Sequence, residues 1–194
     1  MRIEIRSDHV HISGYVNAVG RDSRLIPDKR GGFIEQVEPG TFRRALESGH
    51  PVELRLNHER VLGSTADGTI SLKEDAIGLH AEADISDPEV MESARKGELR
   101  GWSFGFREAK DLWQATDPPR RTLTGFDLTE VSLIDRRKTP AYIGTSVEVR
   151  DSGETITEYR GFEEEPDIFG NDQTDDFVPD YSFRRRILNL KRSK

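Results

Sequence analysis

The chain has 194 residues, a length typical of one domain with an appended segment. Hydrophobic and charged residues each make up 34% and the formal net charge is −7, which predicts a soluble protein and argues against general affinity for nucleic acid. The absence of cysteine excludes disulfides and a cysteine nucleophile, and neither a signal peptide nor a membrane-spanning run is expected, so we predict a cytoplasmic protein that binds no membrane.

The first third of the chain predicts strands, a loop and one helix. Apolar residues alternate with charged ones around Ile3–Ile5 and Val10–Ile12, which predicts an early hairpin. Residues 20–36 are rich in glycine and predict a loop. A helix is expected near residues 41–48, with Thr41 as its cap.

The middle of the chain continues the strand pattern. Alternation predicts a strand at residues 52–58, and Asp67-Gly68 predicts the turn of a hairpin. The segment Leu79–Ile85 alternates again. A second helix follows, in which Asp87-Pro88 supplies the N-cap and the first helical residue.

The last strong strand runs from Thr122 to Ile134, and the character of the chain changes after Arg150. Residues 151–194 have sparse apolar positions, an acidic front and a basic end, which predicts a disordered charged tail. The sequence therefore predicts a mainly β, α+β domain over residues 1–150 followed by this tail.

Residues 101–106 read Gly-Trp-Ser-Phe-Gly-Phe and suggest a nucleophile. In a strand, the three aromatic side chains point into a core and Ser103 points the other way, flanked by glycines. A second peptide backbone could approach such a strip closely. The alternative is that Ser103 is only a small residue at a tight packing point.

A base and an acid for this serine are found on two other predicted strands. His58 continues the apolar alternation of Leu54 and Leu56, so it is expected where a core-facing stripe ends. Alternation likewise places Glu130 on the face of Phe126, and a buried carboxylate there needs a partner such as an imidazole N–H. The alternatives are a histidine bound to backbone and a glutamate paired with an arginine.

A metal site is the rival chemistry. His9 and His11 lie two residues apart, hence on one face of a strand, and His58 or His80 could complete a set of three ligands. No HExxH pattern occurs, and a solvated hairpin explains the first two histidines equally well.

An ordered series of short motifs resembles the prohead proteases of tailed phages of the HK97 type. The series covers about residues 10–150 and comprises Gly14–Ala18, Phe33–Glu35, Glu38–Phe42, Leu56–His58, Gly78-Leu79, Gly101–Phe106, Leu128–Leu133 and Pro140–Tyr142.

The resemblance implies a serine endopeptidase of capsid maturation, with residues 1–150 as the protease domain. It assigns His58 as base, Ser103 as nucleophile and Glu130 as the acidic third residue. The related herpesvirus assemblins have an antiparallel β-barrel-like core flanked by helices, and their oxyanion hole uses an arginine pair that matches Arg136-Arg137 here. No cofactor or metal is implied.

The resemblance also implies where such an enzyme acts and on what. The substrate would be the major capsid protein or a scaffold segment, cut inside the immature prohead in the bacterial cytoplasm, with autolysis of the enzyme. A homodimer is left open, since the assemblins are dimers. The alternative function is a non-catalytic, scaffold-like assembly protein with the same fold.

Overall fold

The computed structural model describes residues 1–28, 31–140, 148–149, 158–159 and 161–163. In chain order its elements are β1 (Arg2–Ile5), β2 (Val10–Ala18), β3 (Ile34–Val37), α1 (Thr41–Glu47), β4 (Glu53–Leu56), β5 (Arg60–Ser64), β6 (Ile70–Glu74), β7 (Gly78–Ile85), α2 (Pro88–Arg95), β8 (Leu99–Gln114), β9 (Arg120–Asp135), β10 (Lys138–Pro140), β11 (Glu148–Val149), β12 (Glu158–Tyr159) and β13 (Gly161–Glu163).

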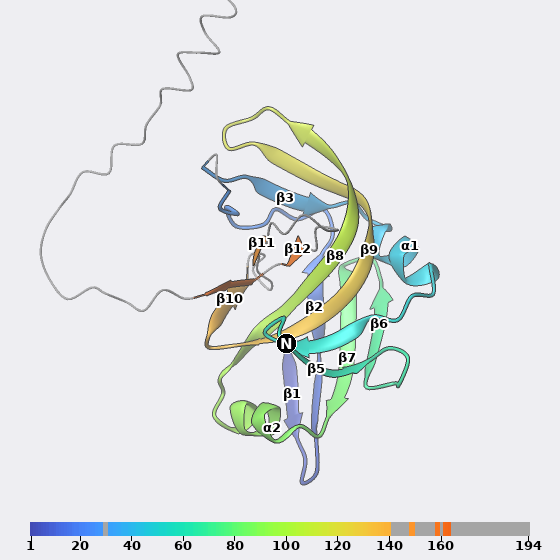
Figure 1. The fold of residues 1–194 in the computed structure, drawn as a ribbon, viewed down its shortest axis with the longest axis vertical. Coiled ribbons are helices and arrows are strands. Elements are labelled where there is room, and N and C mark those ends of the chain that lie inside the picture. Colours follow the sequence, from blue (N-terminus) through green and yellow to red (C-terminus); the bar gives the residue numbers. More distant parts are fainter. Residues whose placement is uncertain (29–30, 141–147, 150–157, 160, 164–194) are drawn as a thin grey trace, which may run out of the picture. The chain divides into compact units, whose positions relative to one another are not determined.

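The long strands β8 and β9 form a curved antiparallel hairpin that runs through the whole body (Figure 1). The other edge of β9 is shared by two parallel neighbours: β3 pairs with its first half and β4 with its second half. The seven-stranded sheet has the order β11-β12-β8-β9-β4-β5, with β3 beside β9. Every candidate site residue from β4, β8 and β9 therefore lies in one sheet.

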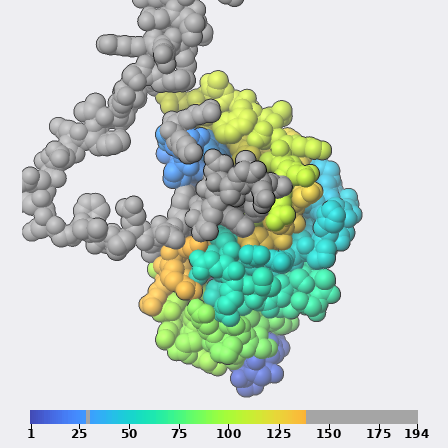
Figure 2. All heavy atoms as spheres, viewed as in Figure 1, coloured from blue at the N-terminus to red at the C-terminus, as the bar shows by residue number. Residues whose placement is uncertain are grey.

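A second sheet has four strands in the order β1-β2-β7-β6, and both sheets contribute to one hydrophobic core. Phe42 of α1 packs edge-on against Phe104 and Phe126, and Phe106 stacks on Phe126 at 4.8 Å between ring centroids. The closed end of the β8–β9 hairpin and the β1–β2 turn lie at opposite ends of this body (Figure 2). No helix among the described residues is both long and apolar enough to span a membrane.

The mainly β, α+β class is confirmed, and the barrel-like character is partial. In the described part of the chain the two large sheets share no strand and do not close into a barrel. The tail prediction for residues 151–194 falls mostly outside the described residues. Within that range β12 pairs with β8 and β13 pairs with β10.

Most predicted elements are confirmed. The loop predicted for residues 20–36 is wrong at its end, where β3 begins at Ile34, and two further details are wrong. The β1–β2 hairpin forms, and Asp87 caps α2 by accepting hydrogen bonds from the backbone N–H groups of Glu89 and Val90. Asp67-Gly68 turns the chain, but β5 pairs with β4 and β6 pairs with β7, so the turn joins two sheets instead of forming a hairpin. Helix α1 has Gly40 as N-cap, with no side-chain cap.

A buried ion pair joins β3 to β9. Glu35 and Arg121 are partners in the parallel register, and Arg121 Nη1 lies 3.2 Å from Glu35 Oε2. Arg121 Nε also donates to Asp111 Oδ2 at 2.7 Å. Glu35 has no exposed surface, whereas the neighbouring pair Arg120–Asp22 is exposed.

We expect Arg121→Ala to lower the free energy of unfolding by about 3–5 kcal/mol, because it leaves a buried carboxylate without that cation. The matched change Arg120→Ala removes an exposed pair and should cost less than about 1 kcal/mol. Urea unfolding of both variants checks this, and equal losses would contradict the role given to burial.

Candidate active site

Strand β4 ends in a tight turn that carries His58. The backbone N–H of Asn57 still donates to Leu133 O at 2.8 Å, but Asn57 and His58 have φ values of 54° and 65°. This left-handed conformation is uncommon outside glycine and is tolerated best by residues such as Asn and His. The turn takes His58 off the core-facing side of Leu56, so the face predicted for His58 by alternation is wrong.

Side chains from the end of the hairpin hold this turn in place. Asn57 Oδ1 accepts a hydrogen bond from the backbone N–H of Asp135 at 3.1 Å. The buried Lys138 donates from Nζ to Asn57 O at 3.1 Å and pairs with Glu59 at 3.2 Å. Strained backbone persists where the surroundings over-determine it, and this is common at functional sites.

The buried carboxylate of Glu130 meets the imidazole of His58. Nδ1 of His58 forms a short hydrogen bond with Oε1 of Glu130, and both side chains are only 3% exposed. Ser132 Oγ donates to the same Oε1 at 3.3 Å, and Arg55 Nε lies 3.1 Å from Oε2. The buried carboxylate therefore has hydrogen bonds on Oε1 and an ion pair with Arg55 on Oε2.

A β-bulge decides which way Glu130 points. Glu130 is opposite Gly105, but the next pair is Leu128 with Phe106, so Thr129 is an additional residue in β9. The bulge reverses the alternation. Phe126 stacks with Phe106 in the core, whereas Glu130 faces the opposite side. The prediction that these two residues share a face is wrong for this reason.

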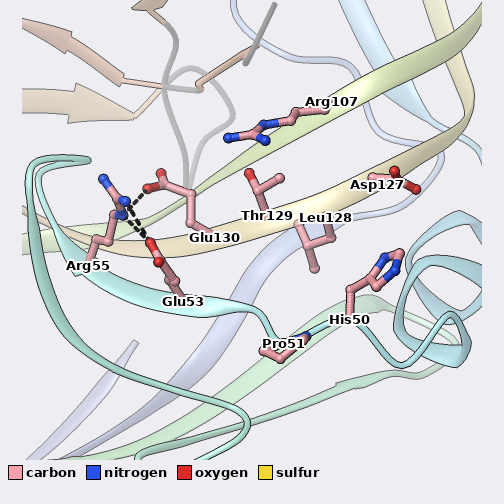
Figure 3. Close-up of a pocket in the computed structure, with 9 residues that line it drawn as sticks. All are labelled: His50, Pro51, Glu53, Arg55, Arg107, Asp127, Leu128, Thr129 and Glu130. Atoms are coloured by element: carbon pink, nitrogen blue, oxygen red, sulfur yellow. Dashed lines mark hydrogen bonds and ion pairs between the residues drawn. The ribbon is translucent and has the colours of Figure 1, made fainter. Parts of the chain in front are cut away.

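Arg55 links the acid to the histidine turn. Its Nε donates to Glu53 Oε2 at 2.7 Å, and its Nη1 donates to the carbonyl oxygen of His58 at 3.3 Å. Figure 3 shows its guanidinium between the carboxylates of Glu53 and Glu130. Arg55 thus neutralises two acids and fixes the position of the His58 backbone.

Ser103 lies on β8, one strand away from these groups. It is opposite Ser132 in the antiparallel ladder, and Ser132 Oγ accepts a hydrogen bond from the His58 N–H at 3.2 Å. Opposite residues in such a ladder have Cα atoms about 4.5–5.5 Å apart and share a face. Ser103 therefore lies on the face of Glu130 and has no exposed surface.

A polar cavity of about 310 Å³ adjoins Glu130 (Figure 3). Charged side chains of both signs line this cavity: the acids Glu53, Asp127 and Glu130, and the bases Arg55 and Arg107. Glu53 and Arg55 are the register partners of Glu130 and Ser132, which places this cavity on the sheet face that carries Ser103.

The arginine pair at the end of β9 is engaged in ion pairs. Arg136 contacts Glu98 at 3.0 Å, and Arg137 contacts Glu89 at 3.0 Å and Asp135 at 2.6 Å. Burial opposes the ionisation of Asp135, but hydrogen bonds from Arg137 outweigh it and hold the pKa of Asp135 below its ordinary value. The oxyanion role of Arg136 and Arg137 stays a prediction.

Two histidines of the rival metal site, His11 and His80, lie in the other sheet, and His9 directly precedes its strand β2. His11 Nδ1 contacts Asp84 Oδ1 at 2.9 Å, and His80 packs edge-on against Tyr15. His58 is instead held by Glu130. No cluster of three potential metal ligands occurs among the described residues.

Sequence reasoning missed Arg55, Ser132 and Lys138. Each contacts the His58 turn or the Glu130 carboxylate. The available signal was the position of Arg55 on the polar face of β4 and of Ser132 two residues after Glu130, which alternation places on one side. The pairing of β4 with β9 was needed to connect them.

We expect Arg55→Met to cost about 1–3 kcal/mol of unfolding free energy, because it removes the cationic partner of a buried carboxylate. In a Glu130→Gln background the same change should cost at least about 0.5 kcal/mol less, since the interaction is already weakened. Urea unfolding in a Ser103→Ala background measures the cycle. The control is Arg120→Met, at the far end of β9, whose loss of unfolding free energy should simply add to that of Glu130→Gln. If the losses for Arg55→Met and Glu130→Gln were also additive, the two residues would not be coupled.

Comparison with known proteins identifies the family of the chain. The family model for Caudovirus prohead serine proteases matches residues 1–159, which is most of the chain. Comparison with curated proteins and with solved structures finds no match. The chain belongs to the family of Caudovirus prohead serine proteases.

Proposed function

We propose that this chain is a serine endopeptidase in which Ser103 is the nucleophile, His58 the general base and Glu130 the orienting acid. The proposed substrate is the major capsid protein or a scaffold segment, cut inside the immature prohead in the host cytoplasm. The observation that carries the proposal is the buried hydrogen bond between His58 Nδ1 and Glu130 Oε1. Its chemistry is that of the acid and base of a serine-protease triad.

The mechanism follows from the tautomer that this bond selects. A carboxylate that accepts from Nδ1–H leaves Nε2 as the basic nitrogen of the neutral imidazole. His58 Nε2 takes the proton of the Ser103 hydroxyl while Oγ bonds to the scissile carbonyl carbon. The imidazolium returns this proton to the leaving amine as the C–N bond breaks. Water, deprotonated by His58, then hydrolyses the acyl-enzyme and regenerates Ser103.

Glu130 and Arg55 have separate tasks in this scheme. Glu130 stabilises the imidazolium and fixes the ring, and Arg55 holds Glu130 and the His58 carbonyl in register. The developing oxyanion is held by backbone N–H groups, an effect of roughly 3–4 kcal/mol in other serine hydrolases. Arg136-Arg137 is the side-chain candidate for the same task. For this task, the two arginines would have to leave their present ion pairs and bind the oxyanion instead.

The tail is a second proposed substrate. Residues 151–194 are charged and poor in apolar positions, a composition that proteases reach easily. We propose that the enzyme removes part of this tail by autolysis. Homodimerisation stays a prediction from the resemblance to dimeric assemblins.

We expect Ser103→Ala to abolish cleavage of the phage's own capsid protein when the two are co-expressed, a loss of roughly 10⁴-fold or more. The matched change Ser132→Ala removes the hydrogen bond that its hydroxyl donates to Glu130 and the one that it accepts from the His58 N–H, and should slow cleavage about ten- to hundredfold, well short of the loss for Ser103→Ala. Gel analysis and mass spectrometry of the capsid protein over time measure both rates.

The same experiment separates the rival functions. Chelator should not change the rate, and inhibition by chelator would favour metal-dependent hydrolysis. Intact capsid protein with the wild-type enzyme, together with capsid binding, would favour the assembly protein. If Ser132→Ala slowed cleavage more than Ser103→Ala did, Ser132 would be the nucleophile in place of Ser103.

Autolysis is tested on the purified enzyme alone. We expect the wild-type chain to lose C-terminal mass during expression or incubation, while Ser103→Ala keeps the full 194-residue mass. The Ser132→Ala variant should be processed more slowly to the same product. Identical full-length masses for wild type and Ser103→Ala would rule out autolysis.

A further inference from the structure

A segment of the chain itself pairs with the nucleophile strand. Strand β12 is antiparallel to β8, with Glu158 opposite Phe106 and Tyr159 opposite Gly105. One edge of β8 is already taken by β9, so β12 lies on the other edge. Gly105 is two residues from Ser103 in the chain. The backbone of residues 158–159 therefore lies along the β8 edge beside the proposed nucleophile.

The register of β12 on β8 points this segment toward Ser103. In the antiparallel ladder each step forward along β12 moves one residue back along β8, so a continuation would bring Gly161 opposite Ser103. Instead, Gly161 pairs with Pro140, and β13 continues along β10 to the pair Glu163–Lys138. Strand β10 also contacts β8. The pairing of β12 with β8 thus ends at Gly105, two residues from Ser103, and residues 161–163 pair with β10.

An extended strand at this edge has the geometry of a bound peptide substrate. Peptides often bind by adding a strand to a sheet edge, where main-chain hydrogen bonds supply affinity. The glycines at 101 and 105 let a second backbone come close on either side of Ser103. Ser103 and Gly105 are buried, so a peptide arriving from outside must first gain access to this edge.

We propose that this edge of β8 is the substrate-binding edge and that Glu158–Tyr159 occupies it as an intramolecular competitor. The proposal rests on the proposed function in taking Ser103 as nucleophile. The ladder between β12 and β8 is only two residue pairs long, so it is weak enough to be displaced. Attachment to the same chain offsets this weakness, since a tethered segment has an effective concentration of about 1 mM.

The test measures binding without catalysis. The probe is a fluorescent peptide with the sequence of residues 155–165, and the proteins carry Ser103→Ala so that no turnover occurs. We expect the additional changes Glu158→Pro and Tyr159→Pro to increase peptide affinity about tenfold in fluorescence anisotropy, because proline removes the competing strand. The matched control Asp175→Pro/Asp176→Pro, beyond the paired segment, should leave affinity unchanged.

A second measurement guards against an effect of misfolding. In the Glu158→Pro/Tyr159→Pro variant, amide hydrogen exchange should increase in residues 103–107 of β8, with β2 and β7 unchanged. Equal peptide affinity in all variants, or no binding to any, would overturn the proposal. So would a concentration-dependent dimer that the proline changes dissociate, since the occupant would then come from a second copy.

The result of the peptide-binding test does not depend on whether the proposed catalytic function is correct. No bond is broken in the binding measurement, so its failure removes the intramolecular competitor and leaves Ser103 as a possible nucleophile. Failure of Ser103→Ala to stop capsid cleavage removes the catalytic assignment, whatever the peptide does.

Discussion

The carboxylate of Glu130 is the group on which the rest of the site depends. An unpaired carboxylate buried this deeply would cost several kcal/mol, so the fold has to bring hydrogen-bond or ion-pair partners to it. Two of them, Arg55 and His58, come from β4 and the turn after it, and the third, Ser132, comes from β9 itself. The parallel register of β4 on β9 places Arg55 and the turn of His58 beside Glu130. A slip by one residue would turn these side chains to the other face of the sheet.

This constraint explains why several residues around the site are polar although they are buried or half-buried. Lys138 and Asn57 secure the left-handed turn, and Glu53 holds Arg55 beside Glu130. None of these side chains needs to touch a substrate. Their contacts keep the imidazole and the carboxylate in place within a sheet whose opposite face is filled by aromatic residues.

Much of the fold could be predicted from local pattern, and the errors have physical causes. Strong alternation and the Asp87-Pro88 cap gave the positions of β7, β9 and α2, because these signals are local. Strand β3 was missed, since four residues after a glycine-rich loop carry little pattern and a parallel partner lies far away in the chain. The Asp67-Gly68 turn shows that the chain reverses, but a turn does not specify which sheet receives the next strand.

The sequence pointed to the residues of the candidate site, but it did not predict correctly which face of the sheet His58 and Glu130 occupy. His58, Ser103 and Glu130 stood out as residue types in strand context, and the structure brings His58 against Glu130, with Ser103 on the adjacent strand. Their faces were misjudged for His58 and for Phe126 relative to Glu130. A left-handed turn and a one-residue bulge each reverse a period-two pattern, and neither has a reliable local signature. Arg55 required knowledge of pairing across the sheet.

The parallel pairing of β4 with β9 also has a consequence during synthesis. Glu53 and Glu130 are neighbours in the sheet although 76 residues separate them in the chain, so this contact has a high sequence separation. A ribosome adds about 5–20 residues per second, and His58 emerges seconds before its carboxylate exists. An incomplete nascent chain therefore holds no assembled acid–base pair. The proposed proteolytic centre can therefore arise only once the β8–β9 hairpin has been made.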